Sequence, residues 1–183
     1  MLKTLIRSAG LACLLAGSAM AQEPASVGGG PMYPDKTIAE NAPNAANLTT
    51  LVAAGKAAGL VDQLAAPGPF TVFAPDNDAF AKLPAGTVDT LLKPENRAKL
   101  TGILSYHVVP ARVTSADALR MIKDGGGKHV VKTVEGAELT LAAAGDKLTI
   151  TDANGATATV TQADVLQKNG VVHVIDSVLM PKE

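Results

Sequence analysis

The spacing of apolar residues predicts a first half built from helices. In residues 45–58 the apolar positions fall close to one face of a helix, and Gly59 follows as a typical helix terminator. Residues 94–106 give the clearest helical pattern, in which an apolar residue or a histidine recurs at positions 100, 103, 104 and 107. Shorter helices are predicted at residues 37–41, 60–65, 76–82, 84–92 and 115–123.

The second half of the chain changes from a helical period to an alternating one. Residues 138–142 and 147–151 alternate polar and apolar side chains, as residues 156–161 do after the turn signal Asn154-Gly155. Apolar strands are predicted at residues 70–74 and 171–175, and a helical turn at residues 164–167. Helices that come first and antiparallel strands that come later indicate an α+β fold.

The N-terminus has the pattern of an export signal. In residues 1–21, Lys3 and Arg7 precede a run of small and apolar residues, which ends in the small-x-small motif Ala-Met-Ala. That run is shorter than the roughly 20 apolar residues that span a bilayer. We therefore expect an exported protein, periplasmic or secreted, without a membrane span. Residues 22–33, with three consecutive glycines, are predicted to be a flexible leader, and residues 34–181 a single domain.

Composition changes this picture in two ways. The predicted signal contains Cys13, which is the only cysteine, so the mature chain must be stabilised by packing and not by disulfides. The signal also holds two of the 16 basic residues and none of the 17 acidic ones, which leaves a net charge of −3. Because nucleic-acid binding calls for a basic stripe, no nucleic-acid partner is expected.

Three of the five aromatic residues outside the signal lie close together in the sequence. Phe70, Phe73 and Phe80 fall within eleven residues, which predicts a core strand that leads into a short helix capped by Asp76. Asp76 and Asp78 lack the further oxygen ligands of a calcium loop. This segment is therefore interpreted as part of the core.

Residues typical of metal or catalytic sites are not grouped in the sequence. His107, His129 and His173 are dispersed, without the clustered ligand spacing of a zinc site. The nucleophile-elbow motif Gly-x-Ser-x-Gly is absent from the sequence. We therefore predict no metal, no cofactor and no catalytic residue, and expect that the protein is not an enzyme.

Three segments together resemble the fasciclin (FAS1) domain family. They are TVFAPDNDAF at residues 71–80, the pair Tyr106-His107 followed by Val-Val-Pro, and GVVHVIDSVLMP at residues 170–181. In this order and spacing they are similar to the two conserved segments and the central Tyr-His pair of that family. The resemblance covers residues 34–181. It implies a wedge of two small β-sheets with helices packed on one side, and a binding module without catalytic activity.

Tyr106 and His107 are the predicted ligand-binding residues. In animal fasciclin proteins the region around this pair has been linked to integrin binding, so the resemblance implies a ligand surface here. The residues themselves also allow a structural role. His107 falls on the apolar stripe at the C-terminal end of a predicted helix, where the helix dipole favours an imidazolium and backbone carbonyls can hold a neutral ring. Both interpretations remain open at this point.

Two functions follow from these observations. The first is an exported, non-catalytic module for adhesion or recognition, which binds a protein or polysaccharide at the cell surface or in the envelope. The alternative is an exported small-ligand carrier or enzyme with a pocket near Tyr106, His107 and His173. A closed apolar pocket with a few polar groups would favour a carrier. An exposed apolar patch or groove would favour an adhesion module.

Overall fold

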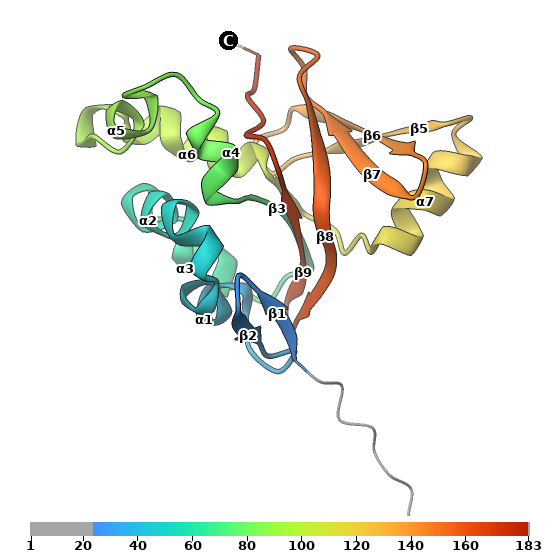
Figure 1. Ribbon diagram of the computed structural model, residues 1–183, viewed down its shortest axis with the longest axis horizontal. Coiled ribbons are helices and arrows are strands. Elements are labelled where there is room, and N and C mark those ends of the chain that lie inside the picture. The colour runs from blue at the N-terminus through green and yellow to red at the C-terminus, as the bar shows by residue number, and fades with distance from the viewer. Residues whose placement is uncertain (1–23, 183) are drawn as a thin grey trace, which may run out of the picture.

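The computed structural model describes residues 24–182, and the predicted export signal lies outside that range. Within it the chain forms seven α-helices, nine β-strands and three short 3-10 helices (Figure 1). In chain order the elements are β1 (Ala25–Val27), β2 (Gly30–Met32), α1 (Ile38–Asn41), η1 (Ala42–Asn44), η2 (Ala46–Leu48), α2 (Thr49–Ala58), α3 (Val61–Ala65), β3 (Phe70–Pro75), α4 (Asn77–Ala81), α5 (Thr87–Leu91), η3 (Pro94–Asn96), α6 (Arg97–Tyr106), β4 (Val108–Val109), α7 (Ser115–Asp124), β5 (Lys128–Lys132), β6 (Glu138–Ala144), β7 (Lys147–Thr151), β8 (Thr157–Gln167) and β9 (Gly170–Ile175).

The predicted helices are present, and local hydrogen bonds explain where several of them begin and end. Thr37 and Glu40 form a reciprocal capping box at the start of α1. Asp76 caps α4, as predicted, by accepting a hydrogen bond of 2.7 Å from the backbone N–H of Ala79. Gly59, also as predicted, ends α2 with a left-handed φ of 75°.

The strands form one mixed sheet in the order β4-β3-β9-β8-β7-β6-β5, next to the separate pair β1-β2. Strands β5 to β9 are a meander of antiparallel neighbours, as predicted. The last strand, β9, then pairs in parallel with β3, so that His173 lies opposite Phe73. The two segments that resemble the conserved parts of the fasciclin domain thus lie side by side on two adjacent inner strands of the sheet.

The structure confirms the α+β class and corrects the predicted arrangement of two small sheets with helices on one side. Strand β8 is long enough to pair with β7 through residues 157–159 and with β9 through residues 160–167. It therefore joins both groups of strands into a single seven-stranded sheet. Helices α1 to α6 lie to one side of β3 and β9, whereas α7 packs against β5, β6 and β7 (Figure 1).

The helical turn predicted at residues 164–167 is wrong, because these residues belong to β8. Asp164 has a φ of 56°, and the pairing register of β8 shifts on either side of Gln162. The Asp164 carboxylate holds this irregularity in place by accepting a 2.7 Å hydrogen bond from the backbone N–H of Ser115. A bulge of this kind interrupts the alternation that marks a strand in the sequence.

The prediction of a flexible leader at residues 22–33 is also wrong for the part that the structure describes. Strands β1 and β2 form a hairpin whose Val27 and Met32 are only 1% and 3% exposed. The missing side chain of Gly30 permits this packing, since a Cβ there would lie 1.7 Å from the carbonyl oxygen of Asn44. Gly30 thus permits close backbone approach, and the folded domain begins before residue 34.

The core is divided into three clusters of buried apolar side chains. One lies between α7 and strands β5 to β8, and another among α2, α5 and α6. The third joins the β1-β2 hairpin and α1 to the inner face of β3, β8 and β9. Within residues 24–182, no helix is long and apolar enough to cross a membrane.

Candidate functional site

Tyr106 is buried and joins three parts of the fold. Its side chain is 0% exposed, although it lies at the end of α6. The hydroxyl donates to the carbonyl of Glu138 at 3.0 Å and accepts from the N–H of Ala153 at 3.0 Å. Burial raises the pKa of this phenol. Both hydrogen-bonding roles of the hydroxyl are thus used inside the domain.

His107 is buried too, and its two ring nitrogens both have partners. Nδ1 lies 2.7 Å from the carbonyl oxygen of Ile103 and must donate to it. Nε2 accepts from the backbone N–H of Leu179 at 3.1 Å. Desolvation lowers the pKa of His107 to about 4, so the ring is neutral at pH 7. The neutral ring connects α6 to the C-terminal segment of the chain.

His173 repeats this arrangement in the centre of the sheet. Nε2 donates to the carbonyl oxygen of Val113 at 2.8 Å, and Nδ1 accepts from the N–H of Asp164 at 3.3 Å. The ring stacks on Phe73 with centroids 5.7 Å apart. Burial lowers the pKa of His173, which also favours the neutral ring.

Ser115, Asp164 and His173 are neighbours, but their contacts do not form a catalytic relay. The Ser115 hydroxyl donates to the Asp164 carboxylate, whereas the imidazole meets only the backbone N–H of Asp164. A nucleophile needs a hydrogen bond to the base that activates it, and the His173 nitrogens are bonded to backbone groups instead. Within residues 24–182, no group of three or more His, Cys, Asp or Glu is placed to hold a metal ion.

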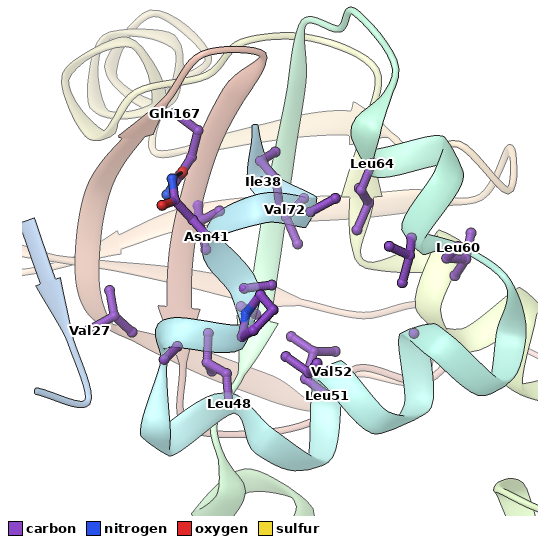
Figure 2. A pocket seen from close by; sticks show the side chains of 18 of the residues that line it. Val27, Ile38, Asn41, Leu48, Leu51, Val52, Leu60, Leu64, Val72 and Gln167 are labelled. Carbon is purple, nitrogen blue, oxygen red and sulfur yellow. Dashed lines mark hydrogen bonds between the residues drawn. The ribbon is translucent and has the colours of Figure 1, made fainter. Parts of the chain in front are cut away.

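An apolar pocket lies between the N-terminal helices and the sheet (Figure 2). Its volume is about 90 Å³, and the side chains around it are almost all aliphatic. A hollow of about 720 Å³ beside Lys99 and Glu135 is larger, but it is a more open depression with a mixed polar and apolar lining. The smaller pocket therefore has the character of a ligand site more than the larger one does.

The walls of the pocket are contributed by several elements. Ile38 comes from α1, Leu51 and Val52 from α2, Leu60 and Leu64 from or beside α3, and Val72 from β3 (Figure 2). The lining residues that reach solvent belong to α1, η1, α2 and α3, so these short helices form the rim.

Two asparagines hold the helices of this wall in place. The Asn169 side chain accepts from the N–H of Ile38 at 3.0 Å and donates to the carbonyls of Leu64 and Ala66. Asn77 accepts from the N–H of Thr50 at 3.1 Å at the start of α2. These bonds satisfy backbone groups at helix ends. Asn169 thereby links α1 to the end of α3, and Asn77 links α2 to α4.

Two neighbouring amides are the principal polar groups of the lining. Asn41 and Gln167 are 1% and 3% exposed, and their side chains meet at one edge of the pocket (Figure 2). The Asn41 amide nitrogen donates to the Gln167 side-chain oxygen and, at 2.7 Å, to the carbonyl of Tyr33. The Asn41 oxygen accepts from the N–H of Tyr33 at 3.1 Å.

The structure places one of the three sequence-predicted residues in this pocket. His107 lines it, whereas Tyr106 and His173 are not among its lining residues. Neither Tyr106 nor His107 faces solvent. That the pair binds a ligand stays a prediction, and for His107 such a ligand would have to lie in the pocket.

Sequence reasoning missed the polar edge of the site. Gln167 fell within a segment predicted to be helical, and Asn41 was placed in a short helix without a role. The contacts of Asn169 with two helices were not predicted either. Only the apolar face of residues 45–58 indicated in advance that something packs on this side.

Comparison with known proteins identifies the class of this domain. The profile of the fasciclin domain family matches residues 46–181. Protein sll1483 of Synechocystis sp. is 50% identical over 145 residues, which cover 79% of this chain and 73% of that protein. Cell surface glycolipoprotein MPB83 of Mycobacterium bovis is 38% identical over 162 residues, which cover 86% of this chain and 65% of that protein.

A solved structure agrees with the fold. The FAS1 domain pair from the insect cell adhesion molecule Fasciclin I superimposes with a TM-score of 0.70 at 21% identity. The match covers 79% of this chain and 51% of the pair. The chain therefore belongs to the fasciclin family and contains one domain of this type within the matched residues.

Proposed function

We propose that this domain is an exported, non-catalytic recognition module that binds a protein or polysaccharide of the cell envelope or surface. The observation that carries the proposal is membership of the fasciclin family, together with a relative named as a cell surface glycolipoprotein. The export pattern in residues 1–21 supports a location outside the cytoplasm.

The contacts of the histidines agree with a non-catalytic role. His107 and His173 are buried and neutral, and each ring nitrogen bonds a backbone group. A general acid or base must instead reach a bound substrate with a free nitrogen. Recognition of a macromolecule would therefore use the outer surface and not these rings.

A binding assay tests this proposal. The mature domain, residues 22–183, is immobilised and exposed to purified envelope polysaccharides, surface proteins and intact cells. We expect saturable binding to one of these, and the same affinity for a variant whose pocket is closed by Gly55→Leu. If no fraction gives saturable binding, the recognition module is the wrong class of function.

The second candidate function is a carrier of a small apolar ligand, and the pocket favours it. The space is apolar and has a few polar groups at one edge, as carrier sites do. By contrast, only four large apolar side chains are exposed in residues 24–182. They are Tyr33, Leu119, Val130 and Val134, of which the last two are close together in the chain.

A further inference from the structure

Gly55 lies inside a helix, at a position where the backbone conformation does not require glycine. It is the seventh of the ten residues of α2, where glycine costs about 1 kcal/mol relative to alanine. Its φ is not positive, and a Cβ built on it would meet no atom within 4 Å. Neither a turn nor close packing thus requires glycine. Since Gly55 lines the pocket, what its missing side chain provides is open space at the rim.

The orientation of the Gln167 amide is fixed by its neighbours. Asn41 must direct its oxygen at the N–H of Tyr33 and its nitrogen at the carbonyl of Tyr33. The remaining N–H of Asn41 then donates to Gln167, whose side-chain oxygen must be the acceptor. The Gln167 nitrogen is consequently turned away from Asn41, and it makes no hydrogen bond within residues 24–182.

A donor in this position is expected to have a partner. Gln167 is 3% exposed and lines a pocket whose walls are mostly aliphatic. Among the described residues only Asn47 Oδ1 is a fully buried side-chain atom without a partner, so the Gln167 nitrogen keeps a little accessible surface. A donor with such restricted access to water still gains free energy from a well-placed acceptor. An occupant that presents an acceptor oxygen to the Gln167 N–H₂ group would satisfy it.

The charges around the pocket select a neutral occupant. The ionisable groups of the lining are His107 and Lys56. His107 is neutral at pH 7, since burial lowers its pKa to about 4. Lys56 is an exposed residue at the rim. An anionic group beside Gln167 would therefore be buried without a counter-charge, which is strongly unfavourable.

The volume limits the part of the ligand that is enclosed. The pocket measures about 90 Å³. An engineered apolar cavity of about 150 Å³ in another protein binds benzene. The pocket is smaller than that cavity, so it encloses a short branched chain or part of a ring, and the rest of the ligand would extend past the rim beside Gly55.

We propose that this pocket binds a neutral apolar molecule, or the apolar end of a larger one, that carries one acceptor oxygen bonded to the Gln167 amide. Gly55 provides the opening. The proposal rests on the second candidate function, and it adds the site and the chemical class of the ligand.

The test compares two probes of nearly equal shape, acetophenone and ethylbenzene, which differ in a carbonyl group. Each is titrated into the mature domain, and binding is followed through methyl chemical shifts of Leu51, Leu60 and Val72. We expect both probes to shift these methyl signals, with acetophenone bound about 3–10-fold more tightly because of one hydrogen bond. Equal affinities would overturn the assignment of an acceptor oxygen.

Three variants locate the site. Gly55→Leu should abolish binding of both probes without lowering the melting temperature, whereas Ala57→Leu, on an exposed position of the same helix outside the lining, should leave binding unchanged. Gln167→Met should remove the preference for acetophenone. If that variant does not fold, the Gly55→Leu comparison still decides whether the pocket is the site.

The outcomes separate this proposal from the recognition module. If neither probe shifts the pocket methyls, or if Gly55→Leu binds as the parent does, the pocket proposal is wrong. The recognition module would bind envelope components through the outer surface of the domain. Neither result with the two probes therefore decides whether that binding occurs. Loss of that binding in Gly55→Leu would show instead that a partner inserts an apolar group here, which overturns the assignment to a small molecule.

Discussion

Two buried regions of this domain differ in whether their polar side-chain atoms are all hydrogen-bonded within the protein. Around Tyr106, His107 and His173, every side-chain nitrogen and oxygen of the three residues bonds the backbone. Of the three rings, only that of His107 also borders the pocket. In the pocket, a glycine leaves space at the rim, and Gln167 keeps a donor without a partner in residues 24–182. The first region resembles an active site by residue type, whereas the second resembles a binding site by geometry.

The comparison shows that residue type alone is a poor guide to a site. Histidines stand out in a sequence because they titrate near neutral pH. In this fold, burial and two backbone partners remove that property from both buried rings. Incomplete packing and an unpaired donor are what distinguish the pocket, and neither is visible in the sequence.

The largest expected effect is a loss of stability on truncating a ring in the packed region. Phe73 is 1% exposed and stacks on His173. Phe73→Ala should lower the free energy of unfolding by about 3–5 kcal/mol, because it leaves a cavity in the centre of the sheet. Urea denaturation measures this, with the half-buried Phe70→Ala as a milder control. A loss below about 1 kcal/mol would contradict tight packing around His173.

The second effect is a loss of stability in acid. His107 has a pKa of about 4 in the folded state and about 6.5 in the unfolded chain, so the unfolded chain binds more protons between these values. Its contribution is fully present above pH 6.5 and is lost as the pH falls to 4, by up to roughly 3 kcal/mol. The lowered pKa of His173 acts in the same direction.

Denaturant titrations at a series of pH values check this expectation. His107→Gln can still donate to one backbone group or accept from another but does not titrate, so its stability should depend less on pH between 6.5 and 4. A parent protein of constant stability in that window would show that the ring is not held neutral as described.

The third effect concerns the hairpin that covers one end of the pocket. Removing residues 22–33 exposes the surfaces that Val27 and Met32 cover, and each buried side chain is worth about 1.5–3 kcal/mol. The entropy gained by releasing the hairpin offsets part of this, so we expect a net loss of about 2 kcal/mol and a drop in Tm of several degrees. Calorimetry of the domain with and without residues 22–33 measures this change in Tm. An unchanged Tm would restore the interpretation of these residues as a flexible leader.

The smallest effect is a gain in stability. Gly55→Ala should raise the free energy of unfolding by about 0.5–1 kcal/mol, because the added Cβ meets no atom and stiffens the unfolded chain. Thermal unfolding of this variant and of Gly102→Ala in α6, where the nearest atom to a Cβ is 3.7 Å away, would give the two values. A destabilised Gly55→Ala would mean that the rim has no free space.

Much of the fold followed from local patterns. The period of apolar residues located the helices, and caps such as Asp76 and Gly59 fixed their ends because they act within one turn. Strands β6 and β7 and the first part of β8 followed from alternation. These features depend on neighbours in the sequence, so the sequence predicts them well.

The parts that sequence reasoning missed depend on contacts between distant segments. The hairpin of Val27 and Met32 is stable only because it packs on α1 and β8, and its glycine run gave no strand pattern. The sequence pattern predicted a strand and a separate helical turn in place of β8, because Asp164 bends the strand to reach Ser115. Gln167 lies in the pocket beside Asn41, a partner that is 126 residues away in the chain.

Xenon binding tests most directly whether the two buried regions differ as described. A crystal pressurised with xenon should show one atom in the pocket, next to Leu51, Leu60 and Val72, because xenon occupies dry apolar cavities. No xenon should lie beside Tyr106 or His173, where packing is complete. Xenon beside Tyr106 or His173, or a pocket that takes up none, would contradict the account.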